Sequence, residues 1–366
     1  MVSMTWKVLE HFTVYREKNM YAAHPNVVRT STGNLLVIFH RSPFLGHSNH
    51  SNPLFNLYLC RSLDDGKTWG DCELVTADQY GGIIDFGTHT LEDGSIFVHA
   101  ATVELIPSFS QEKHTLIEET NWISRPGIPF WIKSVNHGVS WSEPKRFPKI
   151  PDATWGSPAE HSGVSRSGLL NLSGGRLLLP SKATENAAAE SPYFGMLRES
   201  KDMGNTWEYR GRIIQDPIAH FSEPAIQITP SGRIVALYRC HPEGTHDSAK
   251  FLALVYSDDG GDTWSKWKKT SIEGSPGHML KLKDGRIFVT VGTRWEGQMG
   301  CLARVLNEEA SDIDSSPNIV VRSDSQSRDC GYPWAVELND GKVLVVYYFH
   351  YQDGHRGIEG SIIEET

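Results

Sequence analysis

Histidine is the side chain best suited to move protons near neutral pH, and this chain is rich in it. There are sixteen histidines among 366 residues, and an imidazole with an unperturbed pKa of about 6.5 exchanges its proton close to neutrality. We take His24 and His47 as candidates for general acid or base chemistry, and His161 and His278 as candidates for contacting a substrate. A packed, hydrogen-bonded structural histidine is the alternative for each of them.

Metal chemistry has little support in the residue spacing. His47 and His50 are separated by two residues, but no Asp, Glu or Cys stands nearby to complete a ligand set. The cysteines are odd in number and dispersed: Cys60, Cys72, Cys240, Cys301 and Cys330. No pair of them has the spacing of a zinc or redox motif. We therefore expect no catalytic metal, no cofactor, and reduced thiols in a cytoplasmic protein.

One eight-residue pattern occurs four times and indicates how these side chains are positioned. The copies are residues 62–69 (SLDDGKTW), 134–141 (SVNHGVSW), 200–207 (SKDMGNTW) and 257–264 (SDDGGDTW). Successive copies start 72, 66 and 57 residues apart. The Asp or Asn can bind backbone amides of a tight turn, the glycine supplies a positive φ, and the tryptophan plugs the layer beneath.

A second repeat alternates with the first and predicts an all-β fold. Turn residues precede a short apolar run six times, at Gly33, Gly94, Gly174 with Gly175, Gly232, Gly285 and Gly341. Such turns join the strands of β-hairpins, and no helical period persists over a long window. Six units of this size predict one domain over residues 1–366, a six-bladed β-propeller. Residues 6–14 are expected to complete the last blade beside residues 357–364.

Composition excludes several classes of function. The net charge of −9 and the lack of any Lys/Arg run argue against nucleic acid as a partner. No apolar stretch approaches the roughly 20 residues that span a bilayer, so we expect no membrane partner. Residues 1–21 lack the pattern of a signal peptide. The oligomeric state is not determined by these features.

The four repeated segments resemble the Asp-boxes of the sialidase (neuraminidase) superfamily, and the resemblance covers essentially the whole chain. Asp-boxes imply the propeller fold rather than a reaction, since they lie on the blade periphery and also occur in proteins that are not enzymes. More specific are residues 222–239, which resemble the family segment with a glutamate and an arginine, and residues 330–333 (CGYP), which resemble the segment with the catalytic tyrosine.

The resemblance implies Tyr332 as the nucleophile and Glu223 as its base, with Arg239 and Arg294 as a clamp for a substrate carboxylate. Arg304 competes with Arg294 for that role. A neutral tyrosine avoids the repulsion that a carboxylate nucleophile would meet from an anionic sugar. The residues alone also permit a structural ion pair of Glu223 with Arg239 and a packed core tyrosine at 332.

Two departures from the family make this an atypical member. The family begins its first blade with Tyr-Arg-Ile-Pro, whereas residues 21–25 read YAAHP, so Ala23 replaces the first arginine of the carboxylate clamp. The loop at residues 41–53, where the family has its acid/base Asp, contains no carboxylate. Asp85 is the best remaining acid candidate and otherwise a substrate-binding residue, and the pair Glu160-His161 is expected at the same mouth.

Three functions follow as hypotheses. The first is a sialidase-like glycoside hydrolase, exo-acting on a terminal anionic or modified sugar of an oligosaccharide. The second is a uronate lyase, in which a His or Tyr removes the proton α to a carboxylate while arginine stabilises the developing charge. The third is a carbohydrate-binding propeller without catalysis. The product separates the first two, because a lyase product is lighter by one water.

Overall fold

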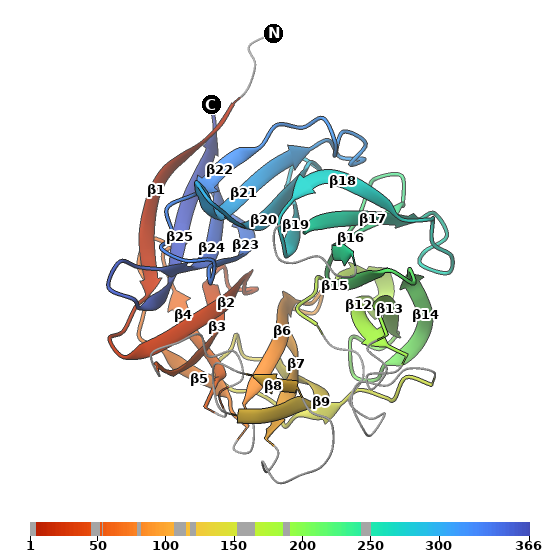
Figure 1. Cartoon of the computed structure of the whole chain (residues 1–366), viewed down its shortest axis with the longest axis horizontal. Coiled ribbons are helices and arrows are strands. Elements are labelled where there is room, and N and C mark those ends of the chain that lie inside the picture. The colour runs from red at the N-terminus through yellow and green to blue at the C-terminus, as the bar shows by residue number, and fades with distance from the viewer. Residues whose placement is uncertain are drawn as a thin grey trace.

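Antiparallel sheets surround a common axis in the computed structural model of this chain. It describes residues 5–44, 52, 54–78, 82–105, 115–117, 122–151, 165–185, 191–242 and 250–366. Within these ranges there are six sheets, and Figure 1 shows them arranged as blades around a centre. The predicted six-bladed β-propeller is confirmed.

Each blade is numbered by the order of its innermost strand along the chain. Blade 1 contains β2 (Met20–Arg29), β3 (Leu35–Pro43), β4 (Asn56–Ser62) and β5 (Glu73–Thr76). Blade 2 contains β6 (Ile83–Thr90), β7 (Ile96–Leu105), β9 (Trp122–Ser134) and β10 (Lys145–Arg146), with β8 (Thr115–Ile117) paired to β9. Blade 3 contains β11 (Leu170–Leu172), β12 (Arg176–Thr184), β13 (Tyr193–Ser200) and β14 (Glu208–Ile214), with a single 3-10 turn at Ser173–Gly175.

The second half of the ring follows the same plan. Blade 4 contains β15 (Ala219–Ile228), β16 (Ile234–Pro242), β17 (Phe251–Ser257) and β18 (Lys268–Glu273). Blade 5 contains β19 (Gly277–Lys281), β20 (Ile287–Trp295), β21 (Gln298–Leu306) and β22 (Ile319–Arg322). Blade 6 contains β23 (Gly331–Glu337), β24 (Val343–His350), β25 (Arg356–Glu365) and, as its outermost strand, β1 (Trp6–Tyr15).

The apolar core lies between neighbouring blades. The buried cluster between blades 1 and 6, for example, contains Val37 and Phe39 of β3 packed with Val346 of β24 and Ile358 of β25. Strands covered on both faces in this way read as continuous apolar runs, such as VLVVYYFH over β24. This packing fixes the rotation of each blade about the axis, and with it the direction of the side chains at the innermost strands.

The four Asp-boxes form the local network that their sequence predicts. In blade 1 the Ser62 hydroxyl accepts a hydrogen bond from the Gly66 amide at 2.8 Å, and the Asp64 carboxylate accepts from the Thr68 amide at 2.9 Å. The boxes begin at the last residue of β4, β9, β13 or β17, the third strand of its blade. Third strands run antiparallel to second strands, so the Asp-boxes lie at the opposite end of the blades from the site described below.

The first strand closes the ring. β1 pairs with β25 from Trp6 opposite Glu365 to Tyr15 opposite Ile358, and Figure 1 shows the red and blue strands side by side. The backbones of Thr5 and Thr366 exchange two hydrogen bonds, of 3.0 and 2.7 Å. This confirms the predicted pairing of residues 6–14 with residues 357–364. Without β1, the long edge of β25 would be left with unpaired amides and carbonyls.

We expect a chain that starts at Arg16 to lose cooperative folding, or to unfold at least about 10 °C below the full chain, because blade 6 loses its outer strand. Thermal unfolding followed by circular dichroism measures this. A circular permutant that joins Thr366 to Thr5 through a short linker and opens at Lys18 keeps every β1–β25 contact and serves as the control. The closure argument is wrong if the truncated chain unfolds at the same temperature as the full chain.

Candidate active site

Four blades place an unusual residue at the same position of their innermost strand. His24, Asp85, Glu223 and Tyr332 have φ values of 54°, 53°, 46° and 51°, in the left-handed region that costs non-glycine residues free energy. Each lies nine residues before the glycine of its hairpin turn, at Gly33, Gly94, Gly232 or Gly341. At each, the strand register with the second strand shifts, which marks a β-bulge.

A bulge re-aims a side chain that regular pleating would direct to a blade face. Here the same bulge recurs at the start of four innermost strands, so the four side chains share one direction relative to their blades. Strain repeated at one position in four blades makes these residues candidates for a functional site, because such conformations persist only when the surrounding structure imposes them. The chain therefore places an imidazole, two carboxylates and a phenol at the axis.

The phenol, one carboxylate and an arginine form a closed triangle. The Tyr332 hydroxyl donates to Glu223 Oε1 at 2.6 Å, and Arg239 Nη1 donates to Glu223 Oε2 at 2.5 Å. Arg239 Nη1 is also 3.2 Å from the Tyr332 oxygen. Glu223 comes from blade 4 and Tyr332 from blade 6, so these contacts join blades that are not neighbours. The structure thus brings together three of the residues named from the sequence.

The charges of this triangle are set by burial and by cations. Burial alone would raise the pKa of Glu223, but Arg239 and Lys182 outweigh it and hold the pKa at about 2. Burial raises the pKa of Tyr332, and the neighbouring Glu223 carboxylate raises it further. At neutral pH the phenol is therefore protonated and the carboxylate is ionised. A protonated phenol donating to a buried carboxylate is the arrangement in which a base can take the proton during attack.

The second carboxylate is paired with a lysine. Lys182 Nζ on β12 lies 3.1 Å from Asp85 Oδ2, and their side chains are 13% and 26% exposed. Burial lowers the pKa of Lys182, but Asp85, Tyr193 and Glu223 raise it on balance. The ammonium therefore stays charged between the two carboxylates of the site. It lowers the cost of ionising Glu223 while it fixes the position of Asp85.

Two further arginines lie against Tyr332. The guanidinium carbon of Arg294 is 5.1 Å from the centre of the phenol ring, and that of Arg166 is 5.4 Å from it. Arg294 donates to the carbonyls of Cys330 and Ser275 at 3.1 and 2.7 Å. Arg166 donates to the carbonyls of Pro333 and Tyr332 at 2.6 and 3.3 Å. Both arginines thus hold the bulge that carries the phenol.

Blade 1 contributes two histidines beside the phenol. The Nδ1 atoms of His24 and His40 are 3.2 Å apart, so one of them carries a proton toward the other. The ring centres of His24 and Tyr332 are 4.3 Å apart. His40 is fully buried and stacks on Phe55, with ring centres 4.4 Å apart. His40 therefore orients His24, which faces the phenol.

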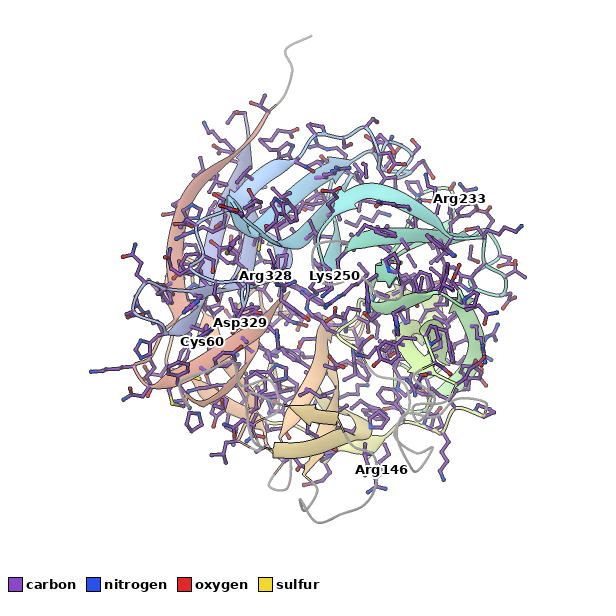
Figure 2. The ribbon with its side chains drawn as sticks, in the orientation of Figure 1. Cys60, Arg146, Arg233, Lys250, Arg328 and Asp329 are labelled. Atoms are coloured by element: carbon purple, nitrogen blue, oxygen red, sulfur yellow. The ribbon has the colours of Figure 1, made fainter. Side chains whose placement is uncertain are left out.

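These groups surround a cavity of about 160 Å³. Its lining consists of His24, His40, Asp85, Arg166 and Tyr332 together with the apolar side chains of Ile84 and Phe86. The volume is below the ~300–1,000 Å³ of clefts that hold drug-sized ligands, so it suits one ring-sized group. Among the described residues around it, four cationic side chains face two carboxylates: Arg166, Lys182, Arg239 and Arg294 against Asp85 and Glu223. Figure 2 also shows Lys250 and Arg328 near the ring centre in this view.

The other candidates from the sequence fall elsewhere. His278 is 7% exposed, its ring stacks on Trp334 with centres 4.1 Å apart, and its Nδ1 accepts a hydrogen bond from the Ala335 amide. It is not among the residues that line the cavity, and burial keeps its pKa well below the usual value. Its observed contacts are thus with Trp334 and Ala335 of β23, and its role as a substrate contact stays a prediction. His47 and His161 lie outside the described residues.

Two statements made from the sequence about arginines can be compared with the structure. Arg304, the competitor of Arg294, donates to Asn318, Ser271 and the Ile313 carbonyl and makes no contact with the triangle. Ala23 pairs with His40 in the strand register, so β2 of blade 1 has no arginine where the family has the first arginine of its carboxylate clamp. A third arginine reaches Tyr332 instead from blade 3, as Arg166.

Sequence reasoning missed Arg166, His40 and Lys182, although the turn repeat contains a signal for each. Arg166 lies nine residues before Gly175, the same offset as His24, Asp85, Glu223 and Tyr332 from their hairpin glycines. His40, Lys182 and Arg239 each lie seven residues after theirs. Counting from the hairpin glycines would have placed all of these residues at the axis.

The described part of the chain contains no cluster of three or more His, Cys, Asp or Glu side chains placed to hold a metal ion. Its helical content is a single 3-10 turn, and no helix in that part is long and apolar enough to cross a membrane. All five cysteines lie in that part and are free thiols.

Comparisons with known proteins agree with this architecture. The sequence matches the BNR repeat-like domain family over residues 106–345, and the chain belongs to this family. A sialidase of Clostridium perfringens is 23% identical over 252 residues, which are 67% of this chain and 60% of that protein. The chain thus spans about three fifths of that relative's length. These matches and the four Asp-boxes define a propeller of the sialidase superfamily, as the sequence predicted.

Solved structures share the fold over nearly the whole chain. A protein of unknown function from Dyadobacter fermentans superposes with a TM-score of 0.90 at 30% identity, covering 99% of both chains. The NanB sialidase of Streptococcus pneumoniae gives 0.65 at 15% identity, covering 96% of this chain and 70% of the other. An alpha-L-arabinanase of Penicillium chrysogenum gives 0.66 at 14% identity, covering 97% and 98%. The chain thus has the fold of glycoside hydrolase-type propellers.

The low pKa of Glu223 predicts how stability depends on pH. The pKa is about 2 in the folded chain against an ordinary 4.5, so ionised Glu223 stabilises the fold above pH ~4.5, and this contribution disappears as the pH falls toward 2. We expect Glu223→Gln to destabilise the chain by about 3 kcal/mol at pH 7, and the difference from wild type to shrink below pH ~4.5. Urea unfolding between pH 7 and 3 measures both.

The exposed Glu143 provides the matched control. Glu143→Gln should follow the wild-type stability at every pH. A difference between Glu223→Gln and wild type that stays constant down to pH 3 would contradict an ionised, stabilising Glu223.

Proposed function

We propose that this propeller is an exo-acting, sialidase-like glycoside hydrolase that removes a terminal sugar carrying a carboxylate. The observation that carries the proposal is the triangle of Tyr332, Glu223 and Arg239, with hydrogen bonds of 2.6, 2.5 and 3.2 Å. A cytoplasmic location of the protein remains an expectation from the sequence alone.

The first chemical step follows from the protonation states. The Tyr332 oxygen attacks the anomeric carbon, and its proton passes to the Glu223 carboxylate along the existing hydrogen bond. The glycosidic bond breaks, and the leaving oxygen takes a proton from an acid of the site. The second step reverses the first: water attacks the glycosyl-tyrosine and gives a proton to the group that acted as acid, while Glu223 returns its proton to the leaving phenol oxygen. Two displacements give a product with retained anomeric configuration.

The excess of cations explains why an anionic sugar is favoured. Arg239 and Arg294 are the groups we assign to the carboxylate, with Arg166 behind the phenol. Arg239 Nε and Arg166 Nε have no acceptor among the described residues. Guanidinium groups bind carboxylates through paired hydrogen bonds. Four cations beside two carboxylates leave a positive site that a substrate carboxylate would balance.

We assign to His24 the role of donating a proton to the leaving oxygen. Its ring lies beside the phenol, and its Nδ1 is paired with His40 Nδ1. Asp85 is less suited to donate a proton because its carboxylate is paired with the Lys182 ammonium, so we assign it to substrate hydroxyls. His47 and His161 stay predictions as acid and substrate contact, respectively.

We expect Tyr332→Phe to lower kcat/KM at least about 10³-fold, because the nucleophile is lost while the packed ring is kept. The measurement is mass spectrometry of products from a panel of sialosides, uronic-acid oligosaccharides and neutral glycosides. Tyr347→Phe is the matched control, since Tyr347 is a buried tyrosine of the neighbouring strand β24 whose hydroxyl hydrogen-bonds to Ser361 and which does not line the cavity.

The products distinguish the proposal from its alternatives. Release of a hydrated terminal sugar, lost in Tyr332→Phe, supports the hydrolase. A product lighter by one water contradicts it in favour of a lyase. Sugar binding that survives Tyr332→Phe, with no turnover on any member of the panel, contradicts it in favour of a binding propeller.

Two substrates that differ in their leaving group test the role of His24 as proton donor. Acid assistance matters most for poor leaving groups, so His24→Gln should slow an alkyl glycoside of the sugar found above by about 10²-fold or more. A 4-nitrophenyl glycoside of the same sugar needs little protonation and should react much nearer the wild-type rate. Equal losses on both substrates would show that His24 is not the proton donor, whereas Tyr332→Phe should reduce both equally.

A further inference from the structure

Two cysteines of blade 1 stand opposite each other on neighbouring strands. Cys60 lies within β4, and Cys72 directly precedes β5. The register pairs Leu59 with Glu73, so the next rung brings Cys60 opposite Cys72. Both side chains pack against the same apolar cluster, between blades 1 and 6. Figure 2 labels Cys60 on the side of the ring formed by this blade.

This placement matches what a disulfide requires. Directly opposite residues of antiparallel strands have Cα atoms about 4.5–5.5 Å apart, within the range of about 4.4–6.8 Å seen across disulfides. The two side chains also point to the same face of the sheet, because opposite residues of a ladder share a face. The expected Cα separation and the shared face are thus those that a disulfide requires.

The two thiols differ in access and in acidity. Cys60 is 1% exposed, whereas Cys72 is only partly buried. The Cys60 thiol lowers the pKa of Cys72 by hydrogen bonding, and the Arg41 guanidinium lowers it further. The pKa of Cys60 is raised in turn, by Cys72 and by burial. Cys72 is thus the more accessible and the more acidic of the two thiols, and Cys60 stands opposite it.

The remaining cysteines have neither the access nor the lowered pKa of Cys72. Cys240, Cys301 and Cys330 are fully buried, and burial raises the pKa of each. A buried thiol of raised pKa reacts slowly with oxidants. The chain therefore contains its own comparison set of inert thiols.

We propose that Cys60 and Cys72 form a reversible redox site, with Cys72 as the attacking thiol and Cys60 as the resolving thiol, oxidised by low-molecular-weight disulfides. The Cys72 thiolate attacks a disulfide RSSR, which gives a mixed disulfide Cys72–S–S–R and releases RS⁻. Cys60 then loses its proton and attacks the Cys72 sulfur, which releases the second RS⁻. Two cysteine thiols are oxidised, and one RSSR is reduced to two RSH.

The cross-link fastens the outer edge of blade 1. β5 is four residues long and pairs with β4 alone, so a short ladder holds the edge in the reduced chain. A disulfide across the Asp-box turn at residues 62–69 joins β4 to the start of β5 covalently and limits how far this edge can open. The same blade carries His24 and His40, but the redox site does not depend on any reaction at the axis.

Incubation of the full chain with oxidised glutathione tests the proposal. The free thiols counted after denaturation should fall from five to three, and reductant should restore all five. Trypsin cuts at Arg61 and Lys67, between the two cysteines, so the disulfide should appear as two joined peptides. The thermal midpoint should rise by a few degrees on oxidation and return on reduction.

Single variants assign the two roles. Cys72→Ser should keep all four of its thiols. Cys60→Ser and Cys60→Ala, two replacements for a buried position, should stop at a stable glutathione adduct on Cys72, because the resolving thiol is gone. Cys240→Ser should behave as wild type and lose two thiols. The proposal is overturned if wild type keeps five free thiols, or if the joined peptides contain any cysteine other than Cys60 and Cys72.

Discussion

Hydrogen bonds between β1 and β25 hold the propeller closed, and the geometry of the axial site depends on them. The site takes side chains from all six blades, which are scattered from residue 24 to residue 332. They meet because a closed ring turns the innermost strand of every blade toward one axis. An open ring would keep each blade but let the blades rotate, and hydrogen bonds as short as 2.6 Å between Tyr332 and Glu223 would not survive.

Within the closed ring, four blades use the same position of their innermost strand for chemistry. A β-bulge with left-handed φ carries His24, Asp85, Glu223 or Tyr332, and the partner position on the second strand carries His40, Arg239 or Tyr348. The blades are alike in backbone and differ in side chain at these two points. Such a scaffold can change its chemistry by substitution at a few axial positions while its core stays the same.

The charges at the axis stabilise one another only as a group. Burial by itself would raise the pKa of Glu223, but Arg239 and Lys182 lower it and keep the carboxylate ionised. Arg166 is almost fully buried, and burial lowers its pKa to about 10, which still leaves it charged at neutral pH. Removing one member would leave an unbalanced buried charge, which costs far more than a lost surface ion pair. The arrangement is therefore one electrostatic unit built from several blades.

Local spacing in the sequence was sufficient for the fold. The Asp-boxes, the hairpin glycines and the apolar runs determined strands, turns and the number of blades, because each depends on residues close together in the chain. Glu223, Arg239 and Tyr332 were found through their resemblance to a family, not through spacing. Only the tertiary structure decided that Arg166 reaches Tyr332 of blade 6, that His40 pairs with His24, and that His278 stacks on Trp334. Those contacts depend on how the blades of the closed ring are oriented relative to one another, and residues close together in the sequence do not determine that orientation.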